Sequence, residues 1–222
     1  FSALPFLIRY TESKTCYQQE SFVIELEQLR NEYSACEMCE LCPKKSGVNG
    51  VVRSSGPLSS IAIVGEAPGA DEDSAGEPFV GRAGKMLDKL LEGAKIKRHQ
   101  VFITNAVKCR PTQNQGKKNR APTVDERESC WPWLHKELSV VQPTAVIALG
   151  KISTELLLDL PKNFTLGEYV NKPHTAELDD GESSCYFHVV PSWHPSYLMQ
   201  HGRKKFDEAV ECFKLAKKLV LQ

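Results

Sequence analysis

An acidic loop follows a short apolar run, with the sequence VGEAPGADED at residues 64–73. Glycine-rich loops at strand ends commonly bind a phosphate through their backbone N–H groups. This loop also carries four carboxylates, which would repel a phosphate at close range. They belong to Glu66, Asp71, Glu72 and Asp73. The loop is therefore a candidate binding site for a ligand other than a phosphate.

Two common nucleotide-binding motifs do not match the chain. A dinucleotide-binding turn has the pattern G-x-G-x-x-G, and the segment GEAPGA has Pro68 in the middle of the turn. A P-loop has Ser or Thr after Gly-Lys, whereas Ile152 follows Gly150 and Lys151. The sequence therefore does not support either of these nucleotide sites.

Five of the eight cysteines lie where they could hold a metal. Cys36, Cys39 and Cys42 are in the segment CEMCELC, and Cys109 and Cys130 bracket a polar loop. A close C-x-x-C pair with two distant cysteines is typical of a metal or cluster site. Four thiolates suit either zinc or a 4Fe–4S cluster, although this spacing fits no common zinc ribbon. The other cysteines, expected to be reduced core thiols, are Cys16, Cys185 and Cys212.

Apolar strands alternate with amphipathic helices along the chain. Short apolar runs predict strands within residues 59–65, 100–107, 144–151 and 186–196. Helical spacing of apolar residues predicts helices at residues 21–35, 84–94, 123–141, 151–160 and 203–220. Continuous apolar strands that alternate with helices form parallel sheets covered on both faces. The sequence therefore predicts an α/β fold, a three-layer αβα sandwich with a central four-stranded parallel sheet.

Length and composition limit the remaining possibilities. A chain of 222 residues can bury a complete core, and we expect one domain over residues 21–222 after an N-terminal extension over residues 1–20. The 28 basic and 28 acidic residues balance, so a nucleic-acid partner would need local basic patches. The apolar runs are all shorter than the ~20 residues of a membrane-spanning helix. We therefore expect no contact with a membrane.

Three polar segments lie at the ends of predicted strands. GEAPG follows the first strand, TNAVKCRP ends the second, and PSWHPS ends the fourth. Parallel sheets bind their ligands at the carboxyl ends of the strands. We therefore expect the three segments to form one pocket.

Three motifs in this order, together with the cysteine pattern, resemble those of the type-4 uracil-DNA glycosylases, the iron–sulfur branch of the uracil-DNA glycosylase superfamily. The motifs are GEAPGADEDSAGEPFVGRAG, VFITNAVKCRP and HPSYL. The resemblance implies a monofunctional hydrolase that cuts the N-glycosidic bond of uracil in DNA and leaves an abasic site. Its partner is uracil-containing DNA, single- or double-stranded. We expect a monomer in the cytoplasm, associated with the nucleoid.

A base-excising enzyme must take its target base out of the stack into a closely fitting pocket. Phe79, in the segment EPFVG, could form a flat wall by stacking on the base. Asn105 can pair with O4 and N3 of uracil and reject cytosine, because its amide both donates and accepts. His194 can donate to O2 as negative charge develops there. Each residue also has a purely structural alternative. Phe79 could be a core residue, Asn105 could cap a turn, and His194 could be a structural histidine of the loop.

The resemblance also gives a role to the acidic loop. In the family, Glu66 is a base-pocket residue, and its backbone lines the pocket with those of Ala67 and Pro68. A carboxylate there could orient the attacking water or stabilise the positive charge that grows on the deoxyribose. Asp73 is the second candidate for this catalytic role. Asp71 and Glu72 are expected to be solvated.

The resemblance selects four of the clustered cysteines as ligands. The family pattern is matched by Cys36, Cys39, Cys109 and Cys130, which implies a 4Fe–4S cluster. Cys42 falls outside this ligand set. Such a cluster would hold the N-terminal helix and the loop after the second strand onto the sheet.

The loop RPTQNQGKKNRAPT is longer than is usual in the family. We expect Lys117, Lys118 and Arg120 to contact DNA phosphates, with a solvated basic loop as the alternative. The related UdgX-like proteins trap the abasic sugar with a histidine at this place, and the corresponding residue here is Asn119. An amide is not such a nucleophile, so we expect the product to be released.

A second DNA contact is expected in the segment HPSYLMQHGRKK. Arg203 and Lys204 would bind the DNA backbone, and Leu198 would wedge between bases. A different class of protein also fits the cysteines and the basic segments, namely an iron–sulfur protein that binds DNA without cutting it. Such a protein would not need the three predicted pocket side chains together.

Overall fold

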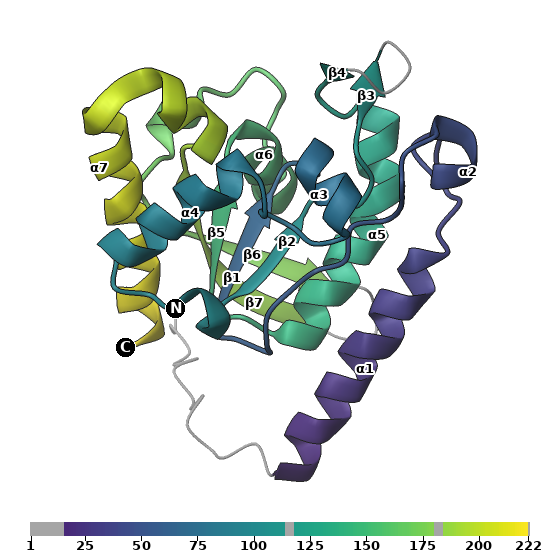
Figure 1. Cartoon of the computed structure of the whole chain (residues 1–222). Helices are drawn as coiled ribbons and strands as arrows, with labels where there is room; N and C mark the ends of the chain where they lie inside the picture. Colours follow the sequence, from purple (N-terminus) through teal and green to yellow (C-terminus); the bar gives the residue numbers. More distant parts are fainter. Residues whose placement is uncertain (1–15, 114–117, 180–183, 222) are drawn as a thin grey trace.

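The computed structural model describes residues 16–113, 118–179 and 184–221 (Figure 1). Its helices are α1 (Cys16–Ser34), α2 (Pro43–Ser46), α3 (Ala70–Ala75), α4 (Arg82–Gly93), α5 (Val124–Val141), α6 (Lys151–Leu158) and α7 (Pro195–Val220). Its strands are β1 (Ile61–Gly65), β2 (Phe102–Asn105), β3 (Thr112–Gln113), β4 (Lys118–Asn119), β5 (Ala145–Leu149), β6 (His174–Asp179) and β7 (Ser184–Ser192). Among these described helices, none combines the length and the apolarity that a membrane span requires.

The central sheet has five strands in the order β2-β1-β5-β7-β6. Parallel pairing of β1 with β2 and β5, and of β5 with β7, confirms the four predicted strands and their direction. The fifth strand, β6, runs antiparallel to β7 at the edge of the sheet, so the predicted four-stranded parallel sheet is corrected to a mixed one. Its sequence HTAELD alternates exposed and buried side chains. This edge strand therefore lacks the continuous apolar run that marks the other four.

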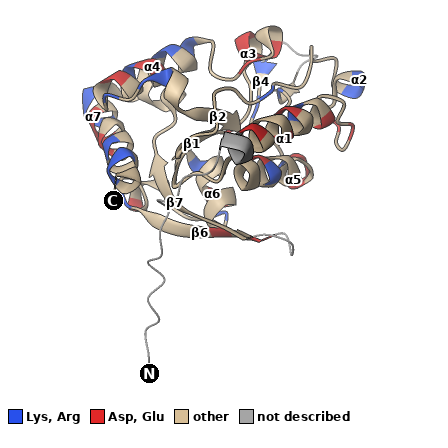
Figure 2. Ribbon diagram, turned by 90° about the horizontal axis from the view of Figure 1, so that it is seen from below, with Lys and Arg blue, Asp and Glu red and all other residues tan. Residues whose placement is uncertain are grey.

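Alternate residues of the strands face two separate cores. Ile61 and Ile63 of β1 pack with α4 and α7, whereas Ala62 and Val64 pack with α1, α5 and α6. Figure 2 shows α4 and α7 on one side of the sheet and α1 and α5 on the other. Because both faces of β1 are covered, each of its side chains is buried. The three-layer αβα sandwich is thus confirmed.

The parallel strands bring the predicted functional segments to one edge of the sheet. Gly65 at the end of β1 pairs with Asn105 at the end of β2. Strand β7 ends at Ser192, shortly before His194, which is the N-cap of α7. Since β1, β2 and β7 point the same way, all three segments lie at the carboxyl edge, where α3 and α4 also begin (Figure 1).

Gly84 lets α4 pack directly against the backbone of the preceding loop. A Cβ atom at Gly84 would lie 1.8 Å from the carbonyl oxygen of Phe79. The substitution Gly84→Ala must push the helix and the loop apart, and we expect it to lower the free energy of unfolding by about 1–3 kcal/mol. Urea unfolding measures this change.

Gly93→Ala is the matched control in the same helix. A Cβ atom there would meet the side chain of Val210 at 3.0 Å, and this side chain can move. Alanine also favours the helix by up to about 1 kcal/mol over glycine. Equal loss of stability in the two variants would contradict the importance of the contact at Gly84.

Candidate active site

A cavity of about 880 Å³ lies at the carboxyl edge of the sheet. Its lining includes residues 66–72 after β1, Asn105 at the end of β2 and His194 after β7. Asn119 and Arg120, at the β3–β4 hairpin, complete one side. The structure therefore collects the three predicted segments around a single cavity.

Phe79 forms one wall of this cavity. Its ring packs so closely on the end of β1 that a Cβ atom on Gly65 would lie 2.5 Å from Cζ of the ring. The backbone of Phe79 is left-handed, with φ at 56°, and its carbonyl oxygen accepts a hydrogen bond from Arg98 at 3.0 Å. The ring centroid is 6.3 Å from that of His194. Phe79 is thus a core residue by burial, at 6% exposed, and a cavity wall at the same time.

Asn105 lines the cavity and has an unpartnered donor. The residue is 3% exposed, and its side-chain Nδ2 has no hydrogen-bond partner among the described residues. A buried donor left without a partner costs about 1–3 kcal/mol. A ligand with an acceptor atom at this place would remove that cost.

His194 is held by its own helix. Its Nδ1 accepts a hydrogen bond from the backbone N–H of Ser196 at 3.2 Å and lies 2.8 Å from the hydroxyl oxygen of the same residue. Burial lowers the pKa of His194 from 6.5 to about 4, so the ring is neutral at pH 7. Because Nδ1 is the acceptor, the proton of the neutral ring is on Nε2. His194 therefore offers one N–H donor and no positive charge to a ligand.

Glu66 is the half-buried carboxylate that comes first after β1 in the cavity lining. Burial raises the pKa of its carboxyl group, and the positive charge of Arg127 opposes this increase. The backbone carbonyl of Glu66 accepts a hydrogen bond from Val107 at 3.0 Å, which ties the loop to the chain after β2. Ala67 and Pro68 line the cavity beside it, as expected.

Asp73 does not belong to the cavity lining, contrary to its predicted catalytic role. Its carboxylate accepts hydrogen bonds from the backbone N–H and the side-chain amide of Asn49, both at 3.0 Å. Arg110 lies 3.9 Å away, and Asp73 is 5% exposed. These contacts use both carboxylate oxygens, so Asp73 holds the segment around Asn49 in place.

Glu72 was expected to be solvated, and the structure buries it. Its two carboxylate oxygens accept the backbone N–H groups of Gly69 and Gly81, at 3.0 and 2.9 Å. Glu72 thereby joins the acidic loop to the segment that carries Phe79. The sequence signal for this contact is the position of Glu72 three residues after the N-cap Gly69, where the Glu of a capping box accepts the N-cap N–H. Asp71 is exposed, as predicted.

Leu198 is buried, which contradicts its predicted role as a wedge between bases. It is 4% exposed and packs in the core formed with α4. Helix α7 begins at Pro195, well before the predicted residue 203, and Leu198 lies one turn after the N-cap on the inner face. The next residue, Met199, is 43% exposed and lines the cavity together with Tyr197.

The basic residues of the hairpin differ in their surroundings. Lys117 lies outside the described residues, and Lys118 is exposed. Arg120 lines the cavity, but both terminal nitrogens of its guanidinium group donate to the carboxylate of Glu126, at 2.7 and 2.5 Å. Lys118 is therefore freer than Arg120 to bind a further anion.

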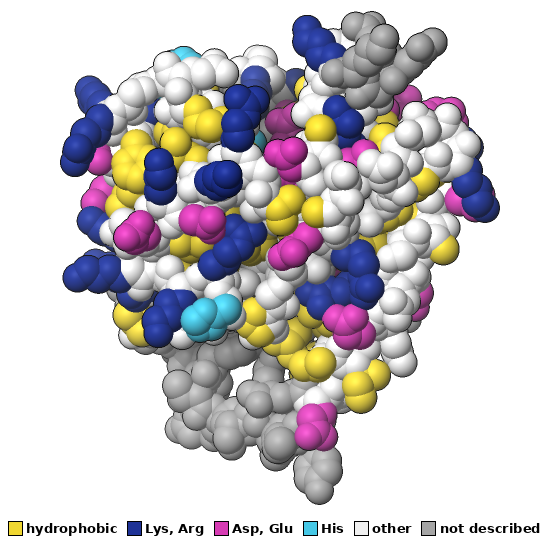
Figure 3. Space-filling model, in the orientation of Figure 1, with side chains coloured by type: hydrophobic (Ala, Val, Ile, Leu, Met, Phe, Trp, Pro, Cys, Tyr) yellow, Lys and Arg dark blue, Asp and Glu magenta, His cyan; other side chains and the backbone are white. Residues whose placement is uncertain are grey.

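The basic residues after the kink of α7 are open to solvent. Gly202 breaks the helix, with φ at 73°, and Arg203 and Lys204 follow it with exposed side chains. Figure 3 shows Lys and Arg side chains over α4 and α7, with Asp and Glu side chains among them. Arg203 and Lys204 thus give α7 a basic surface, although Arg203 lies 3.7 Å from the carboxylate of Asp207.

Five cysteines line a second, small cavity beside the sheet. They are Cys36, Cys39, Cys42, Cys109 and Cys130. The segment from the end of α1 to the start of α2 provides the first three, and the chain after β2 and helix α5 provide the others. The four predicted ligands therefore lie together, and Cys42, at 2% exposed, lies with them.

The surroundings of these cysteines fit a metal cluster. The backbone N–H of Lys108 donates to Sγ of Cys130, and the indole N–H of Trp133 donates to Sγ of Cys36, each at 3.2 Å. Such donors stabilise thiolate ligands. Within residues 16–113, 118–179 and 184–221, no group of three or more His, Cys, Asp or Glu side chains is placed to hold a single metal ion.

Comparisons with known proteins agree with this geometry. The family model of the uracil DNA glycosylase superfamily matches residues 54–217, which contain the whole central sheet and the cavity. The type-4 uracil-DNA glycosylase of Pyrobaculum aerophilum is 40% identical over 149 residues, 67% of this chain and 68% of that protein. Those of Sulfurisphaera tokodaii and Thermotoga maritima are each 35% identical, over 82% and 78% of this chain and 80% and 83% of their own lengths.

The protonation state of His194 can be measured directly by NMR of the ring nitrogens. We expect the proton on Nε2 and a titration midpoint near pH 4, because burial disfavours the charged ring. His194→Asn, which keeps an N-cap acceptor, serves to assign the signal. A midpoint at or above the ordinary value of about 6.5 would show that the cavity does not keep the ring neutral.

Proposed function

Because this chain belongs to the type-4 uracil-DNA glycosylases of the uracil-DNA glycosylase superfamily, we propose that it hydrolyses the N-glycosidic bond of uracil in DNA and leaves an abasic site. The observation that carries this proposal is the unpartnered amide of Asn105 in a cavity walled by Phe79. A flat ring beside an unused amide is what a flipped nucleobase needs for stacking and for hydrogen bonding.

Asn105 reads the edge of the base. Its free Nδ2 donates to O4 of uracil, and its Oδ1 accepts from the N3–H group. Cytosine presents the opposite polarity at both positions, with an amino group at C4 and an acceptor at N3. A buried amide that cannot pair with the wrong base discriminates strongly against it.

His194 stabilises the leaving base. When the glycosidic bond breaks, its electron pair goes to uracil, and negative charge develops on O2. The neutral ring holds its N–H on Nε2, because Nδ1 is occupied by Ser196. One such donor typically lowers the barrier by about 3 kcal/mol.

Glu66 serves the sugar side of the bond. Positive charge grows on the deoxyribose as the base departs, and a water molecule must add to the same carbon. Of the two acids proposed for catalysis, only Glu66 lines the cavity, because the carboxylate of Asp73 is used by Asn49. This role requires the ionised carboxylate. Burial raises the pKa of Glu66, and the positive charge of Arg127 offsets part of this increase.

Uracil-containing DNA lies across the cavity and the basic surface of α7. Lys118, Arg203 and Lys204 are exposed and can bind its phosphates. Met199 replaces the buried Leu198 as the wedge between bases. Its exposed side chain at the cavity can enter the gap left by the flipped base.

Cys36, Cys39, Cys109 and Cys130 hold a 4Fe–4S cluster in this proposal. When bound, the cluster links the end of α1, the chain after β2 and helix α5 through metal–sulfur bonds. The indole and backbone N–H donors at two of the sulfurs support the assignment.

Uracil release tests the function. The parent protein should release free uracil from single- or double-stranded DNA and leave sites that alkali cleaves. Asn105→Asp should lower the single-turnover rate by at least about 100-fold, because the carboxylate cannot donate to O4. Asn119→Asp is the matched control, since it puts the same charge into the same cavity from the β3–β4 hairpin.

Two results would contradict this proposal. One is equal loss of rate in the two Asn→Asp variants. The other is a DNA adduct that survives heat and detergent, which would indicate trapping of the abasic sugar. We expect no adduct, because the hairpin presents Asn119 rather than a histidine to the cavity.

Iron analysis and visible absorption test the ligand set. The purified protein should be brown and contain iron. Alanine at Cys36, Cys39, Cys109 or Cys130 should abolish the colour, whereas Cys42→Ala should keep it. A colourless protein loaded with zinc, or loss of colour in the Cys42 variant alone, would refute the assignment.

A further inference from the structure

Lys108 is a fully buried lysine whose side chain is 2% exposed. Its ammonium group makes three contacts, with the carboxylate of Glu137 at 2.5 Å, the hydroxyl of Thr104 at 2.6 Å and the carbonyl oxygen of Asn105 at 2.9 Å. An ammonium group has three N–H donors, so all of them are used. One of the three holds the peptide of the base-reading residue.

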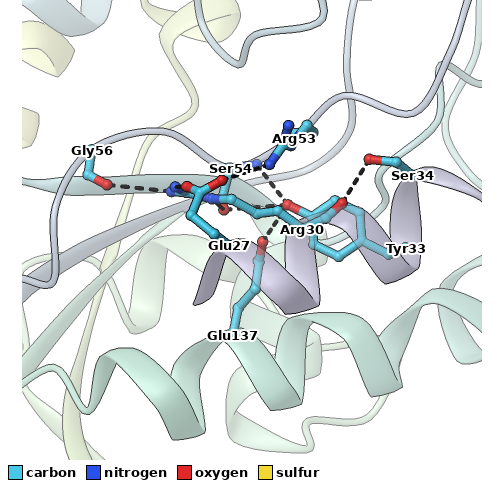
Figure 4. A network of polar contacts seen from close by, with 8 residues as sticks. All are labelled: Glu27, Arg30, Tyr33, Ser34, Arg53, Ser54, Gly56 and Glu137. Atoms are coloured by element: carbon cyan, nitrogen blue, oxygen red, sulfur yellow. Dashed lines mark hydrogen bonds and ion pairs between the residues drawn. The ribbon is translucent and has the colours of Figure 1, made fainter. Parts of the chain in front are cut away.

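Glu137 connects this lysine to the N-terminal helix. It is 0% exposed and accepts the hydroxyl of Tyr33 at 2.9 Å through its other oxygen. The same Tyr33 oxygen accepts the backbone N–H of Ser54 at 2.9 Å. Figure 4 shows Tyr33 of α1 pointing toward both Glu137 and Ser54. The buried network therefore joins α1, α5 and the segment beside β2.

The backbone of Lys108 faces the cysteines. Its N–H donates to Sγ of Cys130 at 3.2 Å, and its carbonyl oxygen accepts from Val52 at 2.8 Å. Lys108 thus contacts the peptide of Asn105 with its side chain and the cysteine cavity with its main chain. It is one direct connection between the two sites, beside the hydrogen bond from Val107 to Glu66.

The amide of Asn105 has no side-chain partner at Nδ2, so its place in the free protein is set through the backbone. Asn105 is the last residue of β2, and the next residue bonds to Gly65 at 2.8 Å. The Lys108 contact fixes the carbonyl between these points. Burying two charges is costly and gives weak support to stability alone. The value of this pair is the direction of its hydrogen bonds.

We propose that Lys108 is a positioning residue of the active site, which fixes the peptide of Asn105 so that the amide meets the edge of uracil. This inference rests on the proposed function for its substrate. If the amide of Asn105 is displaced by a fraction of an ångström, the rate of the chemical step falls while the affinity for DNA stays the same. Lys108 itself does not touch the base.

The variant that tests this role is the double substitution Lys108→Met with Glu137→Gln. It removes the contact with Asn105 and leaves no buried charge unpaired, unlike Lys108→Met alone. We expect the single-turnover rate of uracil release to fall about 10- to 100-fold. Binding of uracil-free DNA and the visible absorption of the protein should stay at the parent's level.

Tyr33→Phe is the matched control at the other end of the network. It removes the hydrogen bond to Glu137 and leaves the contact between Lys108 and Asn105. We expect a lower midpoint of thermal unfolding and a rate within about twofold of the parent. The NMR signal of the Asn105 side-chain amide should shift in the double variant and stay in place in Tyr33→Phe.

The outcomes separate the two proposals. A full rate and an unmoved Asn105 amide signal in the double variant, beside an active parent, would overturn the role of Lys108. Rates that fall in both variants in proportion to lost stability would also overturn it. A parent that releases no uracil would contradict the proposed function, and the amide signal would still decide whether Lys108 positions Asn105.

Discussion

Gly65 sets the constraint on which the rest of the site depends, because no side chain fits at the end of β1. The amide of Asn105 and the ring of Phe79 both pack where a Cβ atom would be. Two segments that are distant in sequence, those of Phe79 and Asn105, therefore pack against the backbone of Gly65. Parallel pairing of β1 with β2 fixes one of them, and the left-handed backbone of Phe79 fixes the other. A planar slot with one polar edge results from main-chain geometry.

The four carboxylates of the acidic loop have different surroundings. Glu72 and Asp73 accept hydrogen bonds from backbone and side-chain donors, so they stabilise the conformation of the loop. Asp71 is exposed to solvent. Glu66 is the half-buried acid of the cavity lining, to which Asp71 and Glu72 also belong. In the proposed function, the negative charge of Glu66 stabilises the sugar cation.

The cysteine cavity and the base cavity share one short stretch of chain. Asn105 ends β2, Lys108 lies three residues later, and Cys109 follows at once. A group bound by Cys109 therefore lies within a few residues of the peptide of Asn105. Tyr33 extends this arrangement to α1, which explains why a helix far along the sequence from the cavity belongs to the same unit.

The sequence by itself determined the αβα layers, the meeting of three segments at the carboxyl edge and the grouping of the cysteines, because these follow from local periodicity and spacing. Only the tertiary structure decided which of two adjacent residues in a helix is buried and which partners each one contacts. Glu72 and Asp73 face different partners because of the rotation of α3, and the start of α7 buries Leu198 while exposing Met199. Strand β6 exists through its pairing with β7. Helix rotation and long-range pairing depend on distant contacts, which a local pattern does not contain.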